Sequence, residues 1–118
     1  MKEIKVGLIK GRHEMPVDKY IFEDEIKDVF DTSFISSSIV QFLNNEVGID
    51  IADFGTCLNQ YEMSDVAHFI GKHKLVVYVT GLSIVLAELI RLCAINGVHL
   101  TLMHYNNSTK EYVSQYIF

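Results

Sequence analysis

The sequence has no tryptophan, one proline and two cysteines in 118 residues. No stretch rich in proline and glycine divides it, so we expect a single domain over residues 1–118. A small secreted domain typically carries several pairs of cysteines. Cys57 and Cys93 therefore favour a reducing, cytoplasmic location, and their apolar neighbours favour buried, unreactive thiols.

The sequence also lacks an excess of basic residues and a long apolar run. Its 15 Asp and Glu outnumber its 10 Lys and Arg, which disfavours DNA binding by charge. The longest uncharged apolar run, residues 75–87, is shorter than the ~20 residues that span a bilayer. Residues 1–10 contain no signal-peptide core. We expect neither direct DNA binding nor membrane insertion.

What the sequence does have is a high apolar content, 49% of its residues, which excludes general disorder. Four short apolar segments have the composition of strands, namely residues 4–9, 48–54, 75–79 and 98–103. Apolar residues at helical spacing predict three helices, from about Asp31 to Asn44, after Ser64, and from Leu82 to Asn96. The acidic residues between Glu23 and Asp31 are expected to form a solvated helix or loop, and no metal site.

The last segment, residues 111–118, alternates loosely and follows a run of turn-forming residues at 106–110. We expect it to form a hairpin with the preceding strand and to be an antiparallel edge of the sheet. Strands that alternate with helices predict a mostly parallel sheet covered on both faces. The expected fold is therefore a three-layer, Rossmann-like α/β domain.

In open parallel sheets, ligands bind beyond the carboxyl ends of the strands. Polar clusters follow all four expected strands, at residues 10–16, 53–56, 80–83 and 104–106. If the strands are parallel, the four clusters lie at the same edge of the sheet. This edge is where we expect a ligand site.

The turn Thr80-Gly81-Leu82-Ser83 joins an expected strand to an expected helix. The glycine allows a ligand to approach the backbone, and the unpaired N–H groups at a helix start favour an anion such as phosphate. The hydroxyls of Thr80 and Ser83 add two donors. The alternative is an ordinary helix start, in which Thr80 or Ser83 caps the helix and nothing binds.

The cationic residues Lys10 and Arg12 are suited to hold a phosphate, unless their loop is merely solvated. His13, oriented by Glu14, and His104 are the candidate acid and base groups. A single histidine such as His104 is also commonly a packing residue. Tyr105, after the fourth strand, completes the candidate ligand-binding residues, although it could instead belong to an aromatic interface.

Residues 74–105 resemble one element of the CRISPR-associated Rossmann-fold (CARF) domains and of related small proteins that bind cyclic oligonucleotides. The similarity consists of the apolar strand 75–79, the Thr80–Ser83 turn and the helix rich in small and aliphatic residues at 84–94. Leu82 stands where a second glycine is common, and no lysine follows Ser83. The resemblance implies a dimer that holds an anionic cyclic nucleotide across its twofold axis, which some relatives cleave.

The function we predict is binding of an anionic nucleotide-type ligand at the carboxyl edge of the sheet, in a homodimer and without a cofactor. Two alternatives remain open. The first is a protein-interaction module of the same fold, and the second is a small phosphoester-cleaving enzyme that uses His13 or His104.

Overall fold

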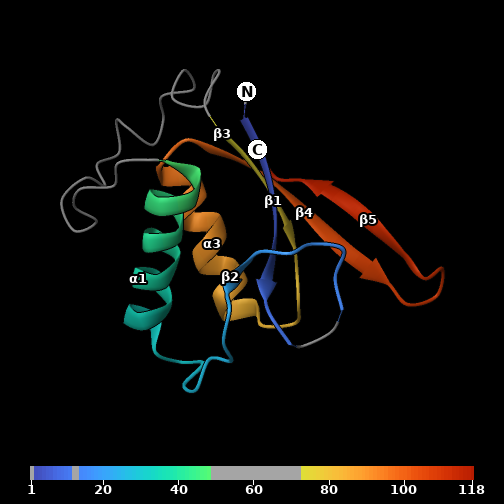
Figure 1. Cartoon of the computed structure of the whole chain (residues 1–118), viewed down its shortest axis with the longest axis horizontal. Helices are drawn as coiled ribbons and strands as arrows, with labels where there is room; N and C mark the ends of the chain where they lie inside the picture. The colour runs from blue at the N-terminus through green and yellow to red at the C-terminus, as the bar shows by residue number, and fades with distance from the viewer. Residues whose placement is uncertain (1, 12–13, 49–72) are drawn as a thin grey trace.

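The computed structural model describes residues 2–11, 14–48 and 73–118, which form a small α/β domain (Figure 1). Its five-stranded sheet has the order β2-β1-β3-β4-β5. The strands are β1 (Lys2–Ile9), β2 (Tyr20–Phe22), β3 (His73–Tyr78), β4 (Val98–Asn106) and β5 (Glu111–Tyr116). The first four strands are parallel to one another, and β5 is antiparallel to β4. The mostly parallel sheet with an antiparallel C-terminal edge is confirmed.

The helices begin and end at local sequence signals. Helix α1 (Thr32–Phe42) begins after Asp31, whose side chain accepts a hydrogen bond from the backbone N–H of Phe34 at 3.0 Å. It continues as a π-helical turn, η1 (Leu43–Val47), which Gly48 ends with a left-handed φ of 82°. Helix α3 (Ser83–Ile95) ends at Asn96. Glycine suits the left-handed position because it has no Cβ to clash with the carbonyl.

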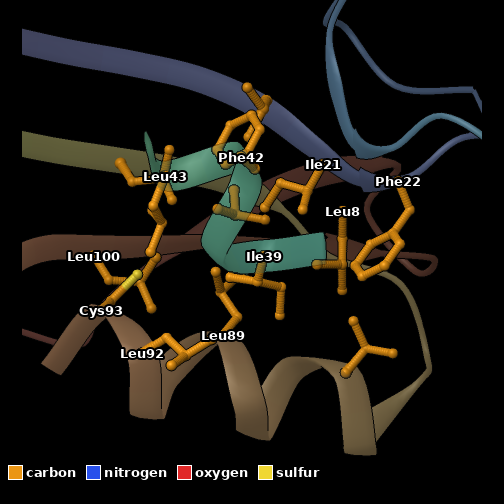
Figure 2. Close-up of a cluster of buried hydrophobic side chains, with 14 of the residues drawn as sticks. Leu8, Ile21, Phe22, Ile39, Phe42, Leu43, Leu89, Leu92, Cys93 and Leu100 are labelled. Carbon is orange, nitrogen blue, oxygen red and sulfur yellow. The ribbon is translucent and has the colours of Figure 1, made fainter. Parts of the chain in front are cut away.

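Both described helices lie on the same side of the sheet (Figure 1) and contact each other. Each contributes fully buried side chains to one core, including Ile39 from α1 and Leu89 and Leu92 from α3 (Figure 2). Ile35 of α1 is also fully buried in this core. On the sheet, this core is made by alternate residues of the three central strands, because successive side chains of a strand point to opposite faces. They are Val6, Leu8, Leu75, Val77, Val98, Leu100 and Leu102.

Cys93 of α3 is part of the same core (Figure 2). Burial raises the pKa of its thiol to about 12, because the apolar surroundings disfavour the thiolate. The expectation of a buried, unreactive thiol is therefore confirmed for Cys93. Cys57 lies outside the described residues.

The opposite side of the sheet, which we call the tyrosine face, carries the other set of alternate residues. The register places on it Lys5 and Gly7, Val76 and Tyr78, Thr101, Met103 and Tyr105, and Tyr112, Ser114 and Tyr116. No described helix covers this face. The helix expected after Ser64, which would have supplied a further layer, lies outside the described residues.

At the carboxyl end of the tyrosine face, the β1–β2 connection packs closely on Gly7. A Cβ built on Gly7 would lie 2.4 Å from ring carbons of Tyr20 and 2.9 Å from the sulfur of Met15. Glycine is therefore required here by close packing. The ring of Tyr112 contacts Tyr78 edge-on, with 4.8 Å between centroids, and burial and the neighbouring phenols raise its pKa.

Several expected boundaries are confirmed, and one strand was not foreseen. The strands predicted at 4–9, 75–79 and 98–103 are present, and β4 continues to Asn106. The strand predicted at 48–54 lies outside the described residues, apart from Gly48. Strand β2 was not expected, and the acidic residues that follow it form a loop up to Asp31. No helix in the described ranges is long and apolar enough to cross a bilayer.

Candidate functional site

A cavity of about 470 Å³ lies at the carboxyl edge of the sheet, where β3 and β4 end. Its lining residues come from two places in the sequence, the turn between β3 and α3 and the start of the β4–β5 hairpin. They are Val79, Thr80 and Gly81 on one side and His104, Tyr105 and Asn107 on the other. Four of the candidate site residues, Thr80, Gly81, His104 and Tyr105, therefore lie around one hollow.

The pairing of β3 with β4 brings the two sides of the cavity together. The two strands are parallel neighbours with Tyr78 opposite Met103, and the backbone N–H of Val79 donates to the Met103 carbonyl at 3.1 Å. Beyond this hydrogen bond the chains separate, because Thr80 begins the turn into α3 while β4 continues. The hollow forms where they part.

Gly81 leaves open space in the turn. A Cβ added to it would meet no heavy atom within 4 Å, and its φ lies outside the left-handed region that favours glycine. In the part of the chain that the structure describes, neither packing nor backbone conformation demands a glycine here. Because Gly81 has no side chain, the backbone beside the cavity is accessible.

The start of α3 lacks a capping side chain. The residue before the helix is Leu82, and no side chain in the described ranges caps the helix there. Leu82 instead packs against the core, so apolar contact sets where the helix begins. The Thr80 hydroxyl oxygen is buried and has no hydrogen-bond partner in the described residues. The expected cap from Thr80 or Ser83 is therefore not formed.

His104 and Tyr105 point to opposite faces of β4, as neighbours in a strand do. The Nε2 atom of His104 lies 2.7 Å from the side-chain oxygen of Gln115 on β5. Tyr105 lies on the tyrosine face, is 41% exposed and contacts the ring of Tyr112 edge-on at 5.2 Å. The cavity thus offers an imidazole held by an amide and an accessible aromatic ring.

Of the candidate residues after β1, Lys10 and Glu14 are described, and neither lines the cavity. The Lys10 backbone N–H bonds to the Phe22 carbonyl, and its exposed ammonium lies 4.0 Å from a Glu23 oxygen. Because β3 separates β1 from β4, Lys10 does not line the cavity. The Glu14 carbonyl accepts a 3.4 Å hydrogen bond from the Tyr112 hydroxyl, so the β1–β2 connection reaches the hairpin. Arg12 and His13 lie outside the described residues.

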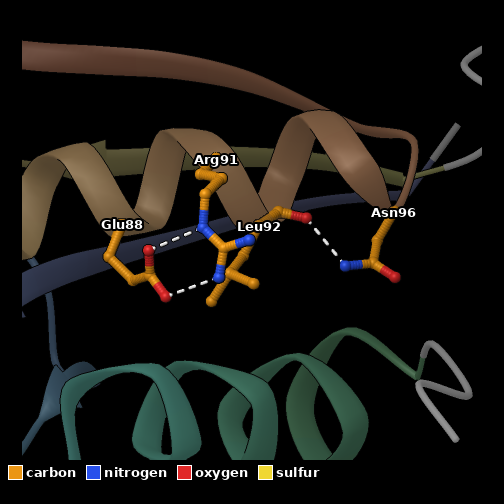
Figure 3. Close-up of polar contacts among 4 residues, drawn as sticks. All are labelled: Glu88, Arg91, Leu92 and Asn96. Atoms are coloured by element: carbon orange, nitrogen blue, oxygen red, sulfur yellow. Dashed lines mark hydrogen bonds and ion pairs between the residues drawn. The ribbon is translucent and has the colours of Figure 1, made fainter. Parts of the chain in front are cut away.

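A larger hollow, of about 680 Å³, lies between α1 and α3 on the side away from the sheet. The side chain of Arg91 donates two 2.8 Å hydrogen bonds to Glu88 at this surface (Figure 3). The Arg91 guanidinium, with help from Ser36, lowers the pKa of Glu88 against the effect of burial. The opposite wall is formed by α1 and the start of η1, with residues at a spacing of about four, Thr32, Ser33, Ser36, Ser37, Val40, Gln41 and Asn44.

Our sequence analysis did not identify this hollow between the helices. The signal that could have found it is the repeat of small polar residues at every fourth position of α1, which places them on one helix face. Glu88 and Arg91 satisfy each other there, so the surface has no unpaired charge from this pair. The carboxyl-edge cavity remains the better candidate site.

In the described segments, no group of three or more histidine, cysteine or acidic residues is placed to hold a metal ion. No protein-family model, curated protein or solved structure matches the chain.

Proposed function

We propose that this protein binds an anionic nucleotide-type ligand in the cavity at the carboxyl edge of its sheet. The observation that carries the proposal is the uncapped start of α3 beside an open turn. Leu82, at the capping position of α3, has no polar side-chain atom to accept hydrogen bonds from the first N–H groups of the helix. A Cβ at Gly81 would meet only open space. Backbone donors and the helix dipole at such a position favour a phosphate.

The other lining residues suit the rest of such a ligand. The buried hydroxyl of Thr80 has no hydrogen-bond partner among the described residues and can donate to a phosphate oxygen. The exposed ring of Tyr105 offers a surface on which a base can stack, a contact worth about 1–3 kcal/mol. The volume of about 470 Å³ is typical of small-molecule sites. His104 supplies a further polar contact.

The sequence resemblance supports the same proposal. The strand, turn and helix that resemble CARF domains are β3, the Thr80–Ser83 turn and α3, and two of the turn residues line the cavity. A homodimer belongs to the proposal as well. Lys10 lies apart from the cavity and is not part of this site, and Arg12 lies outside the described residues. Ser83, as the first residue of α3, would contribute its backbone N–H.

Thermal unfolding of the full chain with defined probes tests the proposal. The probes are AMP, ATP and a cyclic tetra-adenylate, with uncharged adenosine and inorganic phosphate for comparison. A probe at a hundredfold excess over its Kd should stabilise the fold by about 2.7 kcal/mol. This corresponds to a rise in Tm of roughly 10 °C for a domain of this size.

Gly81→Asp is the sharpest variant, because it places a carboxylate beside the proposed phosphate. The space around Gly81 is open and a negative charge near a helix start is favourable, so the fold should be retained. Ser108→Asp, at an exposed hairpin position outside the cavity lining, is the matched control. We expect the Tm rise to vanish in Gly81→Asp and to persist in Ser108→Asp. An equal rise in both variants, or none with any phosphate-bearing probe, would refute the proposal.

A further inference from the structure

The two edges of the sheet differ in how they are protected from pairing with another strand. Edge strands expose unpaired backbone groups, and proteins usually protect them with short length, charge or proline. The β2 edge has only three residues and is flanked by Lys19 and Glu23. The β5 edge has six residues and no proline, and its charges, Glu111 and the flanking Lys110, lie at its beginning only. The β5 edge is therefore ready to pair.

The backbone groups that β5 presents outward follow from its pairing with β4. The Ile117 backbone N–H donates to the Leu100 carbonyl at 2.9 Å, so this residue directs its N–H toward β4. Hydrogen-bonded and non-hydrogen-bonded pairs alternate in an antiparallel ladder. Gln115 and Val113 therefore also bond to β4, whereas Tyr112, Ser114 and Tyr116 direct their backbone groups away from the sheet.

We infer that a second copy of this chain pairs with β5 in antiparallel orientation, with Ser114 opposite Ser114 at the twofold axis. This register is selected because it alone pairs all three outward residues of β5, Tyr112, Ser114 and Tyr116, with one another. It places Tyr112 opposite Tyr116 of the second copy, twice, and Val113 opposite Gln115. The two five-stranded sheets then form one continuous sheet.

The side chains of β5 suit a second copy better than a charged partner strand. Between Tyr112 and Tyr116 no residue is charged, so the shared ladder contains no like-charge pair. Val113 and Tyr116, 51% and 69% exposed, are among the most exposed large apolar residues of the described chain. Aromatic pairs across strands are favourable contacts. Figure 1 shows β5 on the side of the sheet away from α1, where neither helix obstructs a partner.

This inference rests on the homodimer part of the proposed function and is independent of the ligand. The pairing uses the outer edge of β5, whereas the cavity uses the turn before α3 and the end of β4. A chain that dimerises without binding nucleotides, or binds them as a monomer, separates the two proposals.

Disulfide crosslinking tests the register directly. Residues directly opposite in a hydrogen-bonded antiparallel pair have Cα atoms about 5.5 Å apart, within the range of a disulfide. In a Cys57→Ser background, which leaves the buried Cys93 in place, Ser114→Cys should form a covalent dimer on mild oxidation. Gln115→Cys and Val113→Cys, on the same strand but not opposite themselves, should not. Equal crosslinking in all three variants, or none in Ser114→Cys, would overturn the inferred register.

Sedimentation velocity over a concentration series tests the dimer itself. Ser114→Lys places two ammonium groups opposite each other and should weaken dimerisation at least about tenfold. Ser108→Lys adds the same charge to the exposed turn of the hairpin and should leave the dimer intact. Circular dichroism checks that both variants fold. A parent chain that sediments as a 13.5 kDa monomer at every concentration contradicts the inference, as does a dimer that Ser114→Lys leaves unchanged.

Discussion

The two faces of the sheet are built from the same three central strands but are stabilised in different ways. On the helix-covered face, the strand residues and the inner residues of α1 and α3 are aliphatic and close to fully buried. On the tyrosine face, the alternate residues of the same strands mix polar, charged and aromatic side chains with the apolar Val76 and Met103, and contacts between tyrosine rings replace the aliphatic core. Most of the buried aliphatic contacts that stabilise the fold therefore lie on one face. The accessible polar and aromatic side chains lie on the other face and at the carboxyl edge.

This division explains why the cavity lies where it does. The helix-covered face ends in Val79 and Leu82, which pack into the core and hold the turn in place. The tyrosine face ends in Tyr105, which remains partly exposed. The carboxyl edge is where a rigid aliphatic layer meets an accessible polar one, as a binding site requires.

The largest effect is expected on the helix-covered face. Leu89→Ala deletes a fully buried side chain of α3 and should lower the free energy of unfolding by about 2–5 kcal/mol. Met103→Ala deletes a side chain of similar length from the tyrosine face and should cost roughly half or less, because Met103 is only partly buried. Urea denaturation measures both values. Equal losses would contradict the difference between the faces.

A smaller effect is expected where the tyrosine face is tightly packed. Gly7→Ala introduces a methyl group against the ring of Tyr20 and should destabilise the fold by about 1–3 kcal/mol. Gly81→Ala is the matched substitution in open space and should be neutral or stabilising by up to about 1 kcal/mol. Thermal unfolding distinguishes them. A Gly7→Ala variant as stable as the parent would show that the Tyr20 ring moves aside freely.

The ring contacts of the tyrosine face should contribute less still. Tyr112→Leu removes edge-on contacts with Tyr78 and Tyr105, and it should cost about 1–2 kcal/mol. Tyr116→Leu, on the same strand and face but 69% exposed, should change stability by no more than about 0.5 kcal/mol. Chemical denaturation at a low protein concentration keeps dimerisation out of the comparison. Similar costs for both variants would argue against a structured tyrosine cluster.

The smallest effect concerns the outer surface of the helix layer and depends on pH. The hydrogen bonds from Arg91 lower the pKa of Glu88 in the folded state. The pair therefore stabilises the fold above the unfolded pKa of Glu88, and this stabilisation is lost as the pH falls through the lower folded value. Because the pair is partly exposed, we expect less than about 1 kcal/mol.

Urea denaturation at neutral and acidic pH, compared with Glu88→Gln, measures this contribution of Glu88. Glu88→Gln should lose stability at neutral pH and approach the parent at acidic pH. Arg91→Gln removes the cationic partner of Glu88 and should therefore also reduce the pH dependence of stability. A Glu88→Gln variant that differs from the parent equally at both pH values would contradict the role of the charge.

Much of the fold was predictable because its signals are local. Asp31 caps α1 as its side chain allows, the apolar spacing from Leu82 onward forms α3, and the turn-forming residues after Asn106 form the hairpin. Strand β2 was missed because three residues give no periodicity, and its existence depends on pairing with β1. The β4 extension to Asn106 likewise depends on β5 as a partner.

The candidate site was predictable in part. The expectation that clusters at strand ends share an edge placed Thr80, Gly81, His104 and Tyr105 together, since all four line the cavity. Lys10 was grouped with them because the sequence does not reveal strand order, and β3 lies between β1 and β4. The absence of a cap on α3 could not be foreseen either, because it depends on Leu82 packing into the core rather than on the residue types of the turn.

Because Cys93 is buried, its chemical labelling can report when α3 separates from the sheet. A thiol with a pKa of about 12, enclosed by aliphatic side chains, reacts with alkylating reagents and disulfides only when α3 leaves the sheet. With Cys57 replaced, the rate of Cys93 labelling under native conditions gives the frequency of such excursions. A ligand bound at the start of α3 would lower the rate of Cys93 labelling without contacting the sulfur.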